Sequence, residues 1–204
     1  DTVRQGLRLG DGFGWIDLCT SGTPIRRKFM ADGYDALVKA TAEVFAEPEF
    51  AGRKLLYCPA LVGHEHPSRT QANTSHDGTR TLRRSLATAL KYQADVINIP
   101  EWDEQNESTS LRPTTCNSFS HMRIVRYLLR RERGETDYAL PGDDRAIPNL
   151  VLSLRKLVCL GEEIEVELLN IPDSEEDFAY TAELTLKNLA GDVLFRSGSL
   201  SFQA

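Results

Sequence analysis

Four carboxylates lie close together in one polar segment of the chain, residues 100–113. They are Glu101, Asp103, Glu104 and Glu107. Crowded carboxylates repel one another, so we expect at least one to have a raised pKa and to keep its proton near neutral pH. A protonated carboxylic acid beside an ionised carboxylate is the pair that glycoside cleavage uses. The segment therefore predicts glycosidase chemistry, and an acidic solvated loop is the alternative.

The residues around these carboxylates resemble a known signature. Residues 102–113 read WDEQNESTSLRP, which is similar to the W-N-E-W-H-E-G-T-x-I-E-P signature that closes the barrel in glycoside hydrolase family 99 and the related family 71-like proteins. The identical positions, at the same spacing, are Trp102, Glu104, Glu107, Thr109 and Pro113. Upstream, residues 59–69 are loosely similar to a family loop that ends in an arginine, here Arg69.

The resemblance implies a function for the two matched glutamates. Enzymes of family 99 cleave internal α-mannosidic bonds with retention, through a 1,2-anhydro sugar. By the resemblance, Glu104 would be the base on the 2-hydroxyl of the sugar, and Glu107 would be the general acid and then the general base. Trp102 would offer a flat face to a sugar ring, with Asp103 and Asn106 as further substrate contacts. The resemblance implies an α-mannoside or α-glucan substrate, and neither a metal nor an organic cofactor.

The segment also departs from the signature next to the catalytic pair. Gln105 and Asn106 stand where the family has Trp-His, Ser108 replaces Gly, and Arg112 replaces an acidic residue. These changes alter the sugar contacts and leave the glycan open. A non-catalytic carbohydrate-binding or scaffold protein on the same fold is therefore the alternative function.

Histidines mark a second polar loop, residues 63–78. His64 and His66, with His76 and Asp77 further on, form the one metal-like cluster of the sequence. Two histidines separated by one residue can bind zinc if a third ligand converges. We favour substrate hydrogen bonding by His64 and His66, with Arg69 as a further contact. A metal-dependent hydrolase built on this loop is the second alternative, and a plain surface loop is the third.

Three further sets of residues could have a structural or a functional role. Trp15 and Asp17 lie two positions apart on an expected strand, so their side chains face the same side. They either line a sugar subsite or pack structurally, and we favour structural packing. Asn117 and Ser118 fit a helix N-cap. A disulfide between the first two cysteines is conceivable, but free buried thiols are favoured because no CxxC pair occurs; the four are Cys19, Cys58, Cys116 and Cys159.

The elements that must position these residues alternate between strand and helix. The expected strands are 13–19, 54–61 and 95–99, because they are short and apolar. A helix is expected after each strand. The first has Asp32 as a possible cap and an apolar stripe from Tyr34 to Phe45, and the second begins after Thr79. The third has a buried stripe that starts at Phe119, and it ends before Gly134. No Gly-rich phosphate loop opens a helix, so a dinucleotide fold has no support. The fold class is α/β, the C-terminal portion of a (β/α)8 TIM-type barrel, with the loops after the strands forming the active face.

The pattern changes after residue 134. We expect a half-barrel over residues 1–134, a linker at 135–148 and a small antiparallel β-sandwich at 149–204, where apolar and polar residues alternate. The alternating glutamates Glu163, Glu165 and Glu167 are expected to serve solubility, with an interaction surface as the alternative. A complete barrel takes about 250 residues, so either its first units lie outside this chain, which we favour, or the sheet is open.

Composition excludes some partners. The 204 residues are 41% hydrophobic and carry a formal net charge of −6, which argues against nucleic acid, since phosphate contacts need clustered Lys and Arg. The basic stretches 80–84 and 123–133 are expected to be solvated helix faces. No apolar run approaches the ~20 residues that span a bilayer, so no membrane partner is expected. We expect no signal peptide from the first residues, yet a glycosidase of this kind would be secreted or periplasmic.

Overall fold

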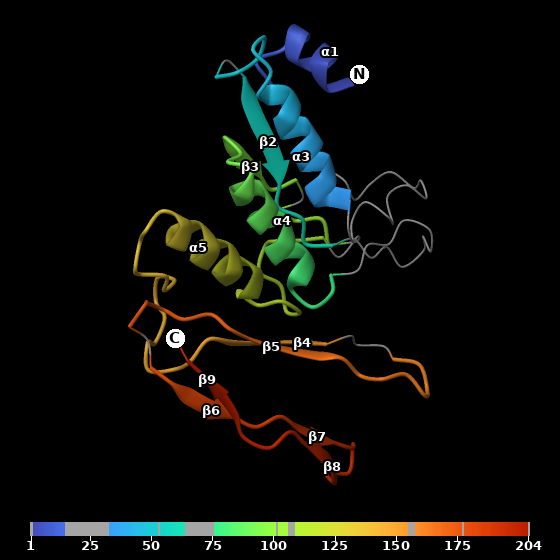
Figure 1. Cartoon of the computed structure of the whole chain (residues 1–204). Coiled ribbons are helices and arrows are strands. Elements are labelled where there is room, and N and C mark those ends of the chain that lie inside the picture. Colours follow the sequence, from blue (N-terminus) through green and yellow to red (C-terminus); the bar gives the residue numbers. More distant parts are fainter. Residues whose placement is uncertain are drawn as a thin grey trace.

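The computed structural model describes most of the chain as a mixed α/β protein followed by antiparallel ribbons (Figure 1). In the part of the chain that the structure describes, no helix combines the length and the apolarity needed to cross a membrane. The described residues are 2–14, 33–52, 54–63, 76–100, 102–105, 109–154, 158–176 and 178–203.

The α/β part contains the predicted alternation of strands and helices. The expected helices and the second and third strands are confirmed, and the first strand is described only as far as Gly14. A short N-terminal helix, α1, was not predicted, although it buries Leu7 completely. The elements are α1 (Thr2–Leu9), β1 (Gly12–Gly14), α3 (Tyr34–Phe45), β2 (Leu55–Pro59), α4 (Arg80–Lys91), β3 (Val96–Asn98) and α5 (Ser120–Glu132).

The three strands form one parallel sheet in the order β1-β2-β3. Leu56 and Cys58 of β2 pack against Val38 of α3 and Ala89 of α4, so both helices cover the same face of β2. Sequential parallel strands with their crossover helices on one face are the arrangement found in a β/α barrel. Among the described residues β1 and β3 are the edges of the sheet, so barrel closure stays a prediction.

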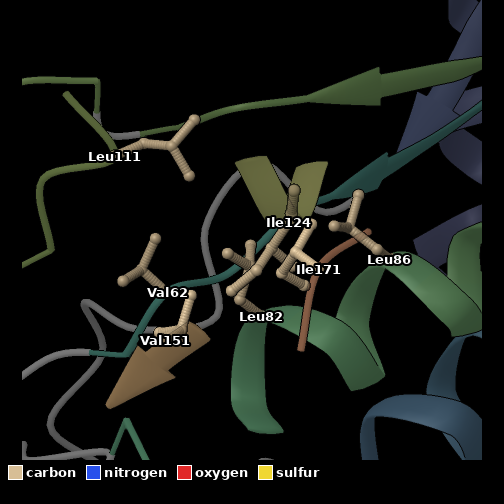
Figure 2. Close-up of a cluster of buried hydrophobic side chains, with 8 residues drawn as sticks. Val62, Leu82, Leu86, Leu111, Ile124, Val151 and Ile171 are labelled. Carbon is tan, nitrogen blue, oxygen red and sulfur yellow. The ribbon is translucent and has the colours of Figure 1, made fainter. Parts of the chain in front are cut away.

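A second core lies between α4, α5 and the first antiparallel ribbon (Figure 2). Ile124 is the residue of α5 that is fully buried there. The expectation that Phe119 starts the buried stripe is wrong, because Phe119 is the N-cap residue, lies before the first helical turn and is 52% exposed. The cluster consists of Ala60, Val62, Leu82, Leu86, Leu111, Ile124, Val151 and Ile171.

The C-terminal strands pair antiparallel, as predicted, in three two-stranded ribbons. The turn 188–192 is closed by a hydrogen bond from Asn188 N to Asp192 O (3.0 Å). The β-sandwich is not confirmed, because no described residue within 178–203 is buried and a sandwich needs a core between two sheets. The ribbons are β4 (Leu150–Leu154) with β5 (Val166–Asn170), β6 (Tyr180–Ala182) with β9 (Leu200–Phe202), and β7 (Thr185–Lys187) with β8 (Val193–Arg196).

The segment 135–148, expected to be a linker, is attached to α5. Tyr138 is buried, and Arg126 Nε donates to its carbonyl oxygen (2.9 Å). Arg123 pairs with Asp143, so its side chain is only 18% exposed. The prediction of a solvated basic face on α5 is therefore wrong for Arg123, because a carboxylate of the following segment covers it. The division into three domains stays a prediction.

Candidate functional site

The two polar loops of interest leave the sheet side by side. β2 and β3 are parallel neighbours whose last residues, Pro59 and Asn98, are in register. Just beyond the strands, Ala60 N donates to Asn98 O (2.8 Å). The loop after β2 (the histidine loop, residues 63–78) and the loop after β3 (the carboxylate loop, residues 100–113) therefore begin at the same edge, where parallel β/α folds keep their active sites.

Backbone hydrogen bonds close the stem of the carboxylate loop. Trp102 O accepts from Arg112 N (2.8 Å) and from Ser110 Oγ (3.2 Å). Glu104 O accepts from both the N–H and the hydroxyl of Thr109, at 3.2 and 3.1 Å. Thr109 and Ser110 are buried. Glu104 is thus held at backbone level to Thr109, which comes two positions after Glu107 in the sequence.

The side chains on the first segment of this stem, residues 102–105, are accessible to different degrees. Trp102 is 45% exposed, Asp103 is exposed, and Glu104 is half-buried. Asn106 and Glu107 lie outside the described residues. The structure therefore brings Trp102 and Glu104 together on one stem, while the pairing of the two glutamates and the raised pKa expected in the loop stay predictions.

Asn117 holds the second segment of the stem, residues 109–113, in place. Its Oδ1 accepts from Thr114 N (2.7 Å), and its Nδ2 donates to the carbonyl oxygens of Ser110 (3.2 Å) and Arg112 (3.3 Å). The expected N-cap role of Asn117 and Ser118 is wrong. The N-cap of α5 is Phe119, without a side-chain cap, because the Asn117 amide satisfies loop groups instead.

A half-buried histidine that sequence reasoning missed supports this anchor. Nδ2 of Asn117 lies 3.1 Å from Nδ1 of His121, which comes four positions later in the first turn of α5. Burial lowers the pKa of His121, nearby His76 lowers it further, and a backbone hydrogen bond to Ser110 opposes both effects. A neutral ring with its proton on Nε2 fits this arrangement, since Nδ1 then accepts from Asn117. No local pattern in the sequence marks this pair, because Asn117 lies before the first residue of α5.

The histidine loop also has a closed stem. A Cβ added at Gly63, which has φ +137°, would lie 2.8 Å from Cγ of His76, so these two residues pack tightly where the loop leaves and returns. His64, His66 and Arg69 lie outside the described residues, and their predicted sugar contacts stay predictions.

Asp77 of the proposed metal cluster is bound to arginines. Its carboxylate contacts Arg80 NH1 (2.6 Å) and Arg84 NH1 (3.7 Å), and two cations there oppose a metal ion. No group of three or more His, Cys, Asp or Glu suited to a metal occurs among the described residues. His64 and His66 are not among them, so the metal hypothesis stays untested in that part.

Of the remaining residues singled out in the sequence, some lie among the described residues and some lie outside them. Trp15, Asp17 and Cys19 lie outside the described residues. Cys58 is a free, buried thiol whose pKa burial raises to about 11, in agreement with the favoured free-thiol interpretation. Cys116 and Cys159 are exposed, so the expectation of buried thiols is wrong for these two. Cys116 lies within a turn, and Cys159 directly precedes one.

An open cavity of about 390 Å³ lies beside Trp102, between the carboxylate loop and α5. Its lining combines apolar residues such as Ile99 and Leu111 with arginines of α5. Sequence reasoning missed this cavity, because it depends on how α5 packs beneath the loop. It is lined by Ile99, Trp102, Leu111, Met122, Val125, Arg126, Leu129, Arg130, Arg133, Glu135 and Leu140.

Comparison with known proteins gives one distant likeness. No protein-family model and no curated protein sequence matches the chain. Among solved structures, the chain is similar to the GH99 endo-alpha-mannosidase from Bacteroides thetaiotaomicron, with 17% sequence identity and a TM-score of 0.45. The match covers 61% of this chain and 38% of that one. At this identity and TM-score, the likeness shows neither a shared site nor a shared activity.

Proposed function

We propose that this chain carries the acid and base of a retaining glycoside hydrolase that acts on an α-linked glycan. The observation that supports it best is the closed stem of the carboxylate loop at the end of β3. This stem holds Glu104 and Trp102 at the edge of a parallel sheet, with both side chains accessible.

In the proposed reaction the two glutamates have different tasks. Glu104 takes the proton of the 2-hydroxyl while that oxygen attacks C1, and Glu107 donates a proton to the leaving oxygen. Water then attacks C1 and opens the 1,2-anhydro sugar, with Glu107 taking a proton from the water and Glu104 returning its proton to the 2-oxygen. Both protonation states are restored, and the configuration is retained. Two inversions at one carbon give net retention, as in other retaining enzymes.

The surroundings of Glu104 suit a sugar ring. The exposed indole of Trp102 provides an aromatic face beside the cavity, and amphipathic aromatic rings are favoured where an apolar ring face and hydroxyl groups must both be met. Asp103, also exposed, is two residues from an exposed amide, Gln105. We assign Asp103 and Asn106 to polar substrate contacts, with His64, His66 and Arg69 contributing from the neighbouring loop.

The experiment measures hydrolysis of α-linked manno- and gluco-oligosaccharides by wild type, Glu104→Gln and Glu107→Gln. Each variant should lower kcat by about 10²–10⁴-fold, since positioned acid–base groups contribute about that much, while glycan binding persists. The matched control is Glu132→Gln, an exposed carboxylate at the end of α5, which should leave kcat unchanged.

A non-catalytic carbohydrate-binding protein would behave differently in the same assay. Wild type would bind the oligosaccharides without turnover, and neither glutamine variant would change the amount of product. That result would reject the hydrolase proposal and retain the fold and the position of the sugar site.

A further inference from the structure

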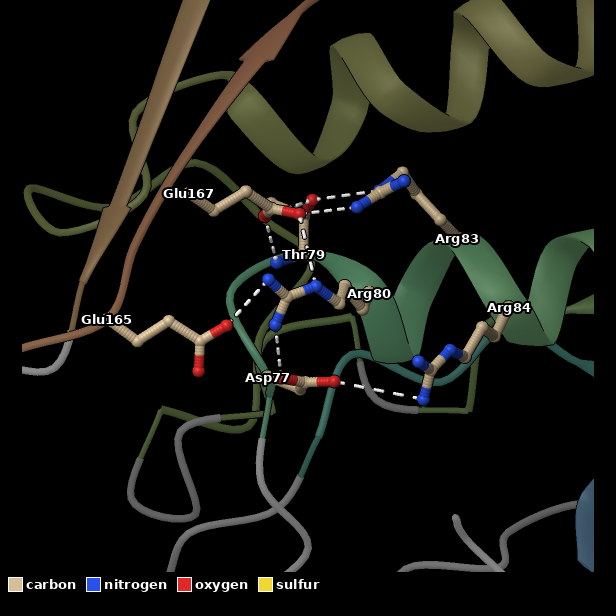
Figure 3. Close-up of polar contacts among 7 residues, drawn as sticks. All are labelled: Asp77, Thr79, Arg80, Arg83, Arg84, Glu165 and Glu167. Carbon is tan, nitrogen blue, oxygen red and sulfur yellow. Dashed lines mark hydrogen bonds and ion pairs between the residues drawn. The ribbon is translucent and has the colours of Figure 1, made fainter. Parts of the chain in front are cut away.

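A cluster of charged side chains joins β5 to the start of α4 (Figure 3). At its centre is Glu167, whose side chain is only 10% exposed. One carboxylate oxygen, Oε2, accepts from the N–H (2.7 Å) and the hydroxyl (2.8 Å) of Thr79. The other oxygen pairs with Arg83. We refer to Glu167 with Thr79 and Arg83 as the β5 clamp.

The backbone turn before α4 is shaped around this carboxylate. Asp77 and Gly78 have φ values of +49° and +63°, a region that favours glycine and tolerates aspartate. A Cβ added at Gly78 would lie 2.6 Å from Oε2 of Glu167. The side chain of Thr79, the N-cap residue, makes no cap hydrogen bond within its own helix. Glu167 therefore supplies the negative charge that stabilises this helix N-terminus.

The turn held by the clamp is also the end of the histidine loop. His76 precedes Asp77 directly and packs on Gly63, where the loop leaves β2. Burial lowers the pKa of His121, the charge of His76 lowers it further, and His121 supports the stem of the carboxylate loop. A movement of residues 77–79 would therefore be transmitted to both loops of the candidate site.

We propose that Glu167 is a positioning residue, which reaches from the C-terminal ribbon to hold the turn 76–79 in place at the end of the histidine loop. This inference rests on the proposed function in so far as it concerns the glycan. Its structural part, that the β5 clamp fixes the turn 76–79, does not depend on it.

The test compares Glu167→Gln with Glu165→Gln in the full chain. Glu165 is the matched control, because it lies on the same ribbon and contacts Arg80 at 2.6 Å, yet its side chain is 71% exposed. Hydrogen–deuterium exchange of ligand-free protein is followed over residues 76–81. KM and kcat are measured on α-linked oligosaccharides. Thr79→Ala is the milder variant if Glu167→Gln does not fold, because it removes the hydroxyl that donates to Glu167 and accepts from Arg83 Nε but keeps both charges.

Glu167→Gln should speed exchange at 76–81 at least tenfold relative to the rest of α4. It should also raise KM about tenfold with kcat within about twofold, since the histidine loop is proposed to supply substrate contacts and not the catalytic groups, and loss of uniform binding raises KM alone. Thr79→Ala should shift both readouts in the same direction by less, and Glu165→Gln should shift neither.

Two results would overturn the inference. One is unchanged exchange at 76–81 in Glu167→Gln. The other is faster exchange spread evenly over the whole chain with an unchanged KM, which would make the clamp a contributor to global stability only. If wild type neither binds nor cleaves glycans, the proposed function fails, and the exchange data still decide whether the clamp fixes the turn.

Discussion

The stems of the two loops at the candidate site are held by different kinds of interaction. In the carboxylate loop, the hydrogen bonds join residues at most ten positions apart, between neutral groups such as Trp102 O and Arg112 N. In the histidine loop, the clamp on Thr79 comes from Glu167, 88 positions away, and it is charged. The first stem is therefore fixed by local sequence, and the second by the packing of a distant ribbon.

This difference has a consequence for how each loop can be disturbed. A stem of neutral, local hydrogen bonds responds to cavities and lost polar partners. A charged clamp around the largely buried carboxylate of Glu167 responds most to removal of the cation or of the hydrogen-bond donors, because that carboxylate is then left without compensation. A mutation can therefore loosen one stem and leave the other unchanged.

Leu111→Ala should have the largest effect on stability. Leu111 is 2% exposed and connects the carboxylate loop to the core shared with the first ribbon, so truncation should cost about 2–5 kcal/mol in the free energy of unfolding. Urea unfolding followed by circular dichroism measures it. A change below about 1 kcal/mol would mean that Leu111 does not fill this core.

Asn117→Ala should have the next largest effect. It leaves the carbonyl oxygens of Ser110 and Arg112 without their amide donor, which should cost about 1–3 kcal/mol. Hydrogen exchange should become faster at residues 109–114 and stay unchanged at 76–79. Equal acceleration in both segments would contradict the independence of the two stems.

The sequence predicts the α/β part well because each strand and helix has a local pattern. The carboxylate loop was found for the same reason, since its acids lie next to one another. The clamp was not found: the basic stretch 80–84 and the acidic face with Glu165 and Glu167 were each expected to be solvated, and they bind each other. Charge patterns do not distinguish a solvated face from a docked one when the partner is 88 positions away. His121 was missed because a single helical histidine gives no pattern.

As the pH is lowered, the two stems should lose their stabilising interactions at different pH values. The pKa of His121 is lowered in the folded protein by burial, then by His76. A neutral His121 therefore stabilises the carboxylate stem fully above its unfolded value of 6.5, and this is lost as the pH falls from 6.5 through the lowered pKa. The pKa of Glu167 is lowered from 4.5 because hydrogen bonds from Thr79 and the charge of Arg83 outweigh the opposing effect of burial.

The clamp is therefore complete above pH 4.5 and is lost as the pH falls below that value. Hydrogen exchange corrected for intrinsic rates between pH 7 and pH 4 should show residues 109–114 loosening first and residues 76–81 later. His121→Gln should remove the earlier transition. Simultaneous loosening of both segments in wild type would show that one titration governs the two stems.

Glu165→Gln should have the smallest effect. The contact of Glu165 with Arg80 is exposed to solvent, and exposed ion pairs contribute little because water and salt screen them. The melting temperature should be indistinguishable from that of wild type at 0.15 M salt. A clear decrease would mean that the ribbon docks on α4 through the whole charged network rather than through Glu167.

The configuration of the first product of glycan cleavage tests the central claim most directly. Proton NMR of an α-linked oligosaccharide during hydrolysis by wild type should show the α-anomer of the new reducing end first, with no such signal for Glu107→Gln. A first product in the β configuration, or the same rate of cleavage by Glu107→Gln, would contradict an acid and a base placed on the loop after β3.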